Sequence, residues 1–180
     1  MFEKSLVRQC APTMAGIKTG SLFSYEMNQK LLQEKVKKLN KILEKYSIKL
    51  LNLCYKKGRG LLYMYRPEML EKDLLGNETK EILAIKNYPV PHMEKCIEKL
   101  TEELKADEEF PHEIGLFLGY PPVDVKGFIK HNAKCEKCVG LWKVYGDVEE
   151  SQKKFCQYKN CTECLMKNFD KYKSLDKLIV

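Results

Sequence analysis

Five of the eight cysteines in this chain of 180 residues lie close together near the C-terminus, and their spacing is the strongest chemical signal in the sequence. Cys135 and Cys138 form one Cys-x-x-Cys pair, Cys161 and Cys164 form a second, and Cys156 lies five residues before the second pair. Each pair can place two thiolates on one ion. The pattern therefore predicts a soft-metal site, for zinc or an iron–sulfur cluster, or else a redox dithiol.

Zinc is the metal that these cysteines favour. Twenty-two residues separate Cys138 from Cys161, slightly more than the roughly 15–20 residues typical of a four-cysteine zinc ribbon. Tetrahedral zinc held by Cys135, Cys138, Cys161 and Cys164 would stabilise a C-terminal lobe that has little core of its own. An iron–sulfur cluster is less favoured, because the run that starts at Cys156 has plant-ferredoxin spacing but falls on a predicted helix. Alternatively, Cys161 and Cys164 lie one helical turn apart and only pack.

A second candidate site, a thiol-dependent catalytic centre, combines Cys10 and Lys18 with His112 and Glu113. Small residues between Cys10 and Lys18 predict a turn whose backbone N–H groups, together with the lysine, would stabilise a thiolate or an anion. His112 would act as the base and Glu113 as the carboxylate that orients it. In the alternative interpretation, Cys10 is buried and Glu113 lies in the first turn after Pro111, where an acidic residue favours a helix start.

The charge pattern suggests a third possibility, an anion-binding interaction module. The net charge is +7, but residues 26–57 carry +6, residues 66–113 carry −6 and residues 126–180 carry +5. Such basic surfaces attract anionic partners or ligands, although nucleic acid is disfavoured because the bases are mostly Lys rather than Arg. Tyr63 and Tyr65 would contribute to an aromatic and basic platform if they are exposed together with Trp142, and to the core if they are buried.

The elements that must position these residues follow from periodicity and turn residues. Apolar residues at helical spacing predict a long amphipathic helix over residues 27–46, with further helices from Pro67, from Asn77 and after Pro91. Residues 48–65 predict a β-hairpin, and residues 140–145 predict a third strand. Asp147, with Glu150 three residues later, predicts the start of a final helix.

These elements predict an α+β fold in which a small antiparallel sheet, made of hairpin 48–65 and strand 140–145, is covered by several helices. Residues 1–131 would form the main domain, and residues 132–180 a cysteine-rich lobe that continues it. The first residues lack the apolar core of a signal peptide, and no apolar run approaches the roughly 18 residues of a membrane span. We therefore expect a cytoplasmic protein whose thiols are reduced and which does not enter a membrane.

Three segments carry a resemblance to a known family: CAPTMAGIKTGSLF at residues 10–23, PHEIGLFLGYPPVDVKGFI at residues 111–129, and GLWKVYGDVEESQKKF at residues 140–155. The chain resembles an uncharacterised family of anaerobic, largely clostridial bacteria, with blocks of the form CxPTxAGxK, HEIGLFLGYP and WKVYGD. The resemblance spans nearly the whole chain. It implies a domain of unknown function in an anaerobic cytoplasm, where oxygen-sensitive thiol chemistry is feasible, and it supplies no activity, substrate or catalytic residue.

Overall fold

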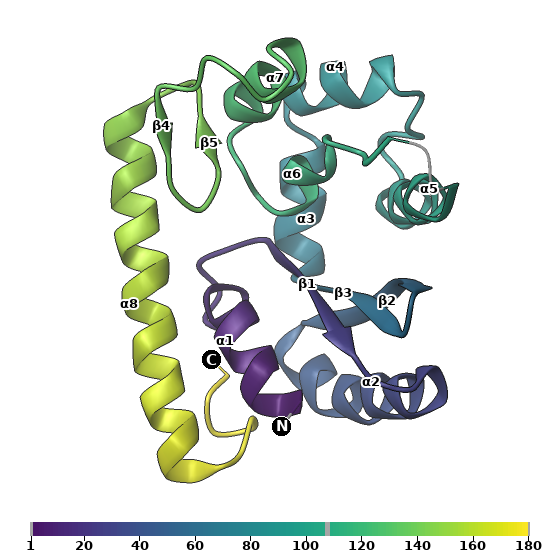
Figure 1. The fold of residues 1–180 in the computed structure, drawn as a ribbon, viewed down its shortest axis with the longest axis vertical. Helices are drawn as coiled ribbons and strands as arrows, with labels where there is room; N and C mark the ends of the chain where they lie inside the picture. The colour runs from purple at the N-terminus through teal and green to yellow at the C-terminus, as the bar shows by residue number, and fades with distance from the viewer. Residues whose placement is uncertain (1, 107–108, 180) are drawn as a thin grey trace. The chain divides into compact units, whose positions relative to one another are not determined.

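The structure is a computed structural model that describes residues 2–106 and 109–179. Within these residues the chain has an α+β fold, as predicted, with helices as the larger part (Figure 1). The helices are α1 (Phe2–Met14), α2 (Gln29–Leu43), the 3-10 helix η1 (Glu44–Tyr46), α3 (Pro67–Leu74), α4 (Asn77–Ile85), α5 (Met93–Ala106), α6 (Ile114–Phe117), α7 (Pro122–Lys130) and α8 (Val148–Tyr172). The strands are β1 (Gly20–Glu26), β2 (Lys49–Lys56), β3 (Arg59–Tyr65), β4 (Cys138–Val139) and β5 (Lys143–Val144).

The chain forms two compact units, and the first is discontinuous in sequence. Unit 1 comprises residues 1–68 and 158–180, and unit 2 comprises residues 69–157. The domain boundary that the sequence suggested, near residue 131, lies inside unit 2. Helix α8 contributes its first part to unit 2 and the remainder to unit 1.

The predicted hairpin of residues 48–65 is confirmed as strands β2 and β3 of unit 1. Lys57 and Gly58 connect the strands, and both have positive φ angles, of 49° and 77°. Two consecutive residues with positive φ match the right-handed twist of a two-residue hairpin, and glycine adopts this conformation without steric cost. The turn residues and the alternation of apolar side chains therefore act together to define the hairpin.

The third strand of the sheet is β1, not the predicted strand at residues 140–145. Strand β1 pairs antiparallel with β3, so the strand order is β1-β3-β2. Residues 138–144 instead form the separate hairpin β4–β5 in unit 2. Gly140 in this hairpin lies so close to α8 that a Cβ atom there would meet the Phe155 ring at 2.1 Å. The hairpin is thus held against a helix of its own unit rather than added to a sheet.

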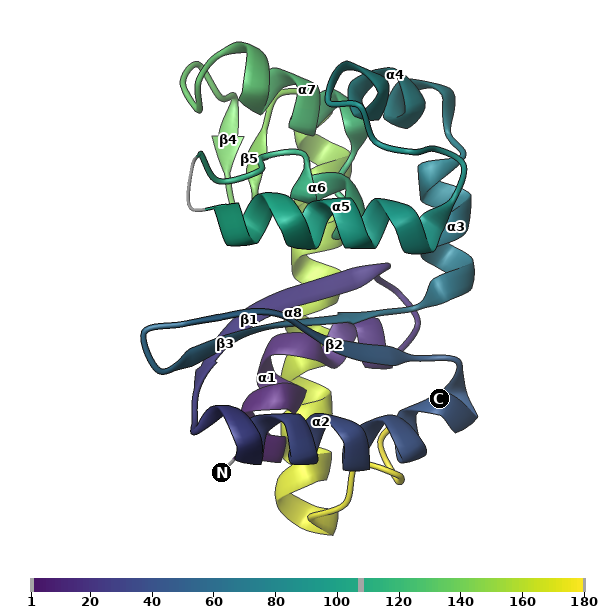
Figure 2. The same ribbon diagram turned by 90° about the vertical axis from the view of Figure 1, so that its right-hand side faces the viewer.

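Helices α1 and α2 and the last turns of α8 cover one face of the three-stranded sheet, and the core of unit 1 lies between them (Figures 1 and 2). Phe23, Leu50, Leu62 and Met64 project from the sheet into this core. The other core side chains include Phe2, Leu6, Val7, Cys10 and Met14 of α1, Leu32, Leu39 and Leu43 of α2, and Phe169 of α8. Burial of these apolar side chains is the main force that holds the segments of unit 1 together.

The C-terminal end of helix α1 is bound by Arg66, the residue that directly follows β3. The Arg66 guanidinium donates to the carbonyl oxygens of Thr13 at 2.8 Å and Met14 at 2.7 Å. These carbonyls belong to the last turn of α1, where carbonyl oxygens have no N–H partners within the helix. A cation at this end also interacts favourably with the helix dipole. Arg66 therefore positions the segment that contains Lys18.

Unit 2 is organised around a buried carboxylate. Asp124, in the first turn of α7, is 2% exposed. It accepts hydrogen bonds from Trp142 Nε1 at 2.7 Å and from the backbone N–H groups of Tyr145 and Gly146, both at 2.8 Å. These bonds join α7 to the segment that follows β5. The predicted start of α8 is confirmed next to them, since Asp147 Oδ1 accepts a bond from the Glu150 N–H at 2.9 Å.

Candidate functional site

The two Cys-x-x-Cys pairs belong to different units. Cys135 and Cys138 lie at the β4–β5 hairpin of unit 2, whereas Cys161 and Cys164 lie on the part of α8 that belongs to unit 1. Cys135, Cys156 and Cys164 are exposed, and Cys138 and Cys161 are partly buried. Burial raises the pKa of the Cys161 thiol, and the neighbouring Cys164 raises it further. This environment favours the neutral thiol over the thiolate that binds metals.

The described residues contain no group of three or more Cys, His, Asp and Glu side chains arranged to hold a metal ion. A structural zinc site needs four ligands on one ion, and a two-iron cluster also needs four. The zinc and cluster hypotheses stay predictions, which metal analysis of anaerobically purified protein can test.

Cys10 and Lys18 interact electrostatically within unit 1, and burial shifts the pKa values of both side chains. Cys10 has no exposed surface, and burial raises the pKa of its thiol to about 12. The Lys18 charge lowers this pKa, but by less than burial raises it. Burial lowers the pKa of the Lys18 ammonium to about 8. A thiol with this pKa is neutral near pH 7 and is a poor nucleophile.

His112 and Glu113 lie in unit 2, and their side chains contact different groups. The half-exposed His112 ring packs edge-on against Phe128 at 4.9 Å, and its Nε2 lies 3.7 Å from Glu109. Glu113 is 3% exposed and accepts a hydrogen bond from the Tyr88 hydroxyl at 2.9 Å. Burial and the adjacent Glu113 charge raise the pKa of Tyr88. Glu113 therefore orients Tyr88 rather than His112.

The aromatic platform proposed from the sequence is wrong. Tyr63 has no exposed surface, Tyr65 is 2% exposed and Trp142 is 8% exposed. The tyrosine rings stack on one another at 4.9 Å, and Trp142 packs against Phe155 in unit 2. Side chains this deeply buried cannot stack on a ligand, and they serve the core.

The fold gathers basic charge into one unit. Unit 1 contains the basic segment 26–57 and, from the second basic segment, residues 158–180. It has 19 Lys and Arg residues and 8 Asp and Glu residues, which gives a formal net charge of +11. Unit 2 carries 13 basic and 17 acidic residues, a net charge of −4. The net charge of +7 for the whole chain is thus the sum of a positively charged unit 1 and a negatively charged unit 2.

Within unit 1, lysines from distant parts of the sequence line one cleft. The cleft has a volume of about 340 Å³ and lies between α1, α2 and residues 169–176. Three lysines line it, Lys35 and Lys38 of α2 and Lys173 just after α8, together with the carboxylates of Glu3 and Asp176. Lys35 Nζ lies 3.2 Å from Glu3, and Lys173 Nζ lies 3.2 Å from Asp170. No ion pair joins the exposed Lys38 to another residue in the described ranges.

Comparison with known protein families gives one match over nearly the whole chain. Residues 6–179 match the family described as a protein of unknown function (DUF3793). The chain belongs to this family. The sequence resemblance is thus confirmed at the level of a family without an assigned function. No curated protein and no solved structure matches the chain.

In this DUF3793 chain, sequence reasoning identified the basic segments but missed the lysine-rich cleft. From the sequence alone, Lys35 and Lys38 are predicted to lie on a solvated helix face. The segment across the cleft from them, residues 169–176, lies more than 130 positions later in the chain. The charge pattern was the available signal, because two basic ends that flank an acidic middle can meet only if the chain returns on itself. No helix in the described part of the chain is long and apolar enough to cross a membrane.

Proposed function

We propose that this DUF3793 protein is an anion-binding module that uses unit 1 to hold a phosphate-rich polymer. The observation that carries the proposal is the convergence of Lys35, Lys38 and Lys173 on one cleft in a unit of net charge +11. Against these lysines stand the carboxylates of Glu3 and Asp176, so the cleft lining has a formal charge of +1. The excess positive charge of unit 1 as a whole adds to this and raises the local concentration of anions.

The existing ion pairs of the cleft do not prevent such binding. Lys35 and Lys173 pair with Glu3 and Asp170 in partly exposed positions, where an ion pair contributes about 0–1 kcal/mol. A phosphate group that carries more charge can replace a carboxylate partner at little cost. Lys38 offers an ammonium that the described side chains do not neutralise.

The residue types also indicate how selective the binding would be. Lysine is a compact point charge that attracts phosphate but does not read base edges as the planar arginine fork does. The tyrosines that would have stacked on bases are buried. We therefore expect binding that depends on charge and salt and not on nucleotide sequence, and inorganic polyphosphate and single-stranded oligonucleotides share the relevant chemistry.

Fluorescence anisotropy with labelled polyphosphate, and separately with a labelled oligonucleotide, tests the proposal. The triple variant Lys35→Gln, Lys38→Gln and Lys173→Gln should bind at least tenfold more weakly than the native chain at low salt. The slope of log affinity against log salt should fall by roughly 0.7–0.9 for each lysine that contacts phosphate. The ratio of affinities for the two probes identifies the preferred polymer.

A matched control separates the cleft from net charge alone. The triple variant Lys95→Gln, Lys130→Gln and Lys153→Gln removes three exposed lysines from unit 2 and changes the net charge equally. It should bind as the native protein does. Equal weakening by both triple variants, with circular dichroism showing both folded, would contradict a site at the cleft.

A further inference from the structure

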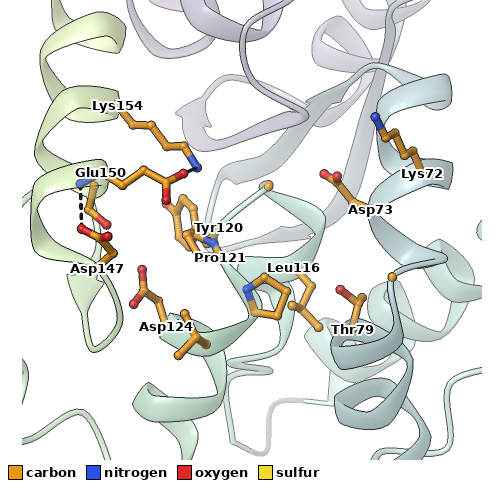
Figure 3. A pocket seen from close by; sticks show the side chains of 15 residues that line it. Lys72, Asp73, Thr79, Leu116, Tyr120, Pro121, Asp124, Asp147, Glu150 and Lys154 are labelled. Carbon is orange, nitrogen blue, oxygen red and sulfur yellow. Dashed lines mark hydrogen bonds and ion pairs between the residues drawn. The ribbon is translucent and has the colours of Figure 1, made fainter.

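Unit 2 contains a cavity that none of the sequence-predicted sites includes. Its volume is about 430 Å³, which is within the range of small-molecule sites. Helices α3, α4, α7 and α8 and the loop after α6 surround it (Figure 3). Gly119 in that loop has a φ of 73°, so glycine permits the left-handed turn that brings Tyr120 to the cavity wall.

Carboxylates outnumber ammonium groups around this cavity. Asp73 of α3 and Glu150 of α8 extend toward the cavity from opposite sides (Figure 3). The lining also includes Asp124 and Asp147, against two lysines, which gives a formal charge of −2. Asp124 and Asp147 accept hydrogen bonds from backbone and indole donors, and Glu150 pairs with Lys154 at 3.0 Å. The Glu150–Lys154 pair joins residues four apart on an accessible helix face and contributes only about 0.3–0.5 kcal/mol. Asp73 also interacts with another residue.

Two buried residues with hydroxyl groups provide an independent sign of a ligand. Thr79 and Ser151 are each 3% exposed, and both line the cavity. Figure 3 shows the Thr79 hydroxyl turned toward the cavity. Neither hydroxyl is hydrogen-bonded to another side chain or carbonyl in the part of the chain that the structure describes. Neither oxygen is fully buried, since both residues line the cavity, so both hydroxyls can accept a hydrogen bond from a ligand there.

The remaining wall is apolar and aromatic. Leu116, Pro121 and Pro122 line the cavity beside Tyr120, whose ring stacks on Trp142 at 4.8 Å. Such a surface suits a short hydrocarbon chain, and an aromatic ring also attracts an organic cation. The lining thus combines acceptors for an ammonium group with an apolar surface for the carbons that carry it.

We propose that the cavity of unit 2 binds a small aliphatic amine in its protonated form. Asp73 and Glu150 supply opposing negative charges, Thr79 and Ser151 accept hydrogen bonds from the ammonium group, and Tyr120 and the prolines contact the carbon chain. The site is distinct from the lysine-rich cleft of unit 1 and has the opposite charge preference.

Isothermal titration calorimetry with 1,4-diaminobutane, and with 1,4-butanediol as its neutral analogue, tests this proposal. The diamine should bind and the diol should not. Asp73→Asn and Glu150→Gln should each weaken diamine binding at least tenfold, because each removes one negative charge from the cavity. Thr79→Val keeps the shape of the side chain and should weaken binding about fivefold through the loss of one acceptor.

The matched controls lie on the same helices. Glu71→Gln removes an exposed charge from α3, and Glu149→Gln removes a helical ion pair, with Lys153 at 2.8 Å, of the same kind as the Glu150 pair. Both should leave the affinity unchanged. The proposal is overturned if the diamine does not bind to native protein, if the diol binds equally well, or if the control variants weaken binding as much as the cavity variants.

Discussion

At the scale of single residues, burial decides which of the candidate nucleophiles can react. In the sequence, Cys10 is a candidate nucleophile because Lys18 and small residues follow it. In the structure, both the cysteine and most of α1 are buried. Burial raises the pKa of Cys10 to about 12. Near pH 7 about one molecule in 10⁵ would carry the thiolate, since each pKa unit changes the ratio tenfold. The Cys10-centred enzyme hypothesis stays a prediction, and its nucleophile is the weakest part of it.

Alkylation measures this difference directly. In native protein at pH 7.5, iodoacetamide should modify the exposed Cys135, Cys156 and Cys164 at least 100-fold faster than Cys10, because Cys10 is both inaccessible and neutral. Peptide mass spectrometry at timed intervals gives the rate for each cysteine. In guanidinium chloride all the rates should become similar. Rapid modification of Cys10 in folded protein would restore it as a nucleophile.

At the scale of elements, Asp124 shows how one polar residue can hold two segments together. It fills the position where α7 begins, and its two oxygens accept three hydrogen bonds from the chain around β5. Hydrogen bonds to a charged acceptor contribute more than neutral ones, about 1.5–3 kcal/mol each, and leaving their donors unpaired in a buried site is costly. The hairpin β4–β5 is too short to hold this position by its own strand pairing.

Replacing this residue should therefore destabilise unit 2. We expect Asp124→Ala to lower the free energy of unfolding by about 3 kcal/mol, because it leaves buried donors without an acceptor. Urea denaturation followed by the fluorescence of Trp142, the single tryptophan, reports on this unit. The exposed Glu94→Ala is the control and should change the stability by less than about 0.5 kcal/mol. A loss below about 1 kcal/mol for Asp124→Ala would show that the three bonds are dispensable.

At the scale of the whole molecule, charge is divided between two compact units. Unit 1 carries +11 and unit 2 carries −4. A high net charge of one sign keeps a protein soluble but opposes its compact state by self-repulsion. Unit 1 should bear this cost in the absence of an anion, and a polyanion that binds it should relieve the repulsion.

Salt should therefore stabilise the two units unequally. Between 0.1 M and 1 M salt the screening length falls from about 10 Å to about 3 Å, which weakens repulsion among the lysines of unit 1. We expect the amides of β3 to exchange roughly fivefold more slowly at the higher salt, which corresponds to about 1 kcal/mol, while those of α5 in unit 2 change less. Hydrogen exchange with mass spectrometry reports both in one sample. Equal slowing in the two units would indicate a general salt effect on burial.

Periodic and local signals carried much of the element prediction. Helix α2 has apolar residues at helical spacing and an Asn28 side chain that accepts from the Lys30 N–H at 3.0 Å, so its start and its buried face are both local properties. The β2–β3 hairpin and the start of α8 at Asp147 are also encoded within a few residues. The cysteine spacing is a local signal as well, but spacing alone does not determine whether two pairs meet.

What the sequence by itself determined is the α+β class, most helices, the hairpin and the family, because these depend on periodicity, turn residues and characteristic blocks within short windows. Only the tertiary structure decided that β1 completes the sheet, since a seven-residue strand with glycine and two serines becomes a strand by pairing with β3. It also decided that Cys10 is buried and that Lys173 lines a cleft with Lys35 and Lys38. Burial and convergence depend on which distant segments pack together, and that information lies in long-range contacts rather than in any local pattern.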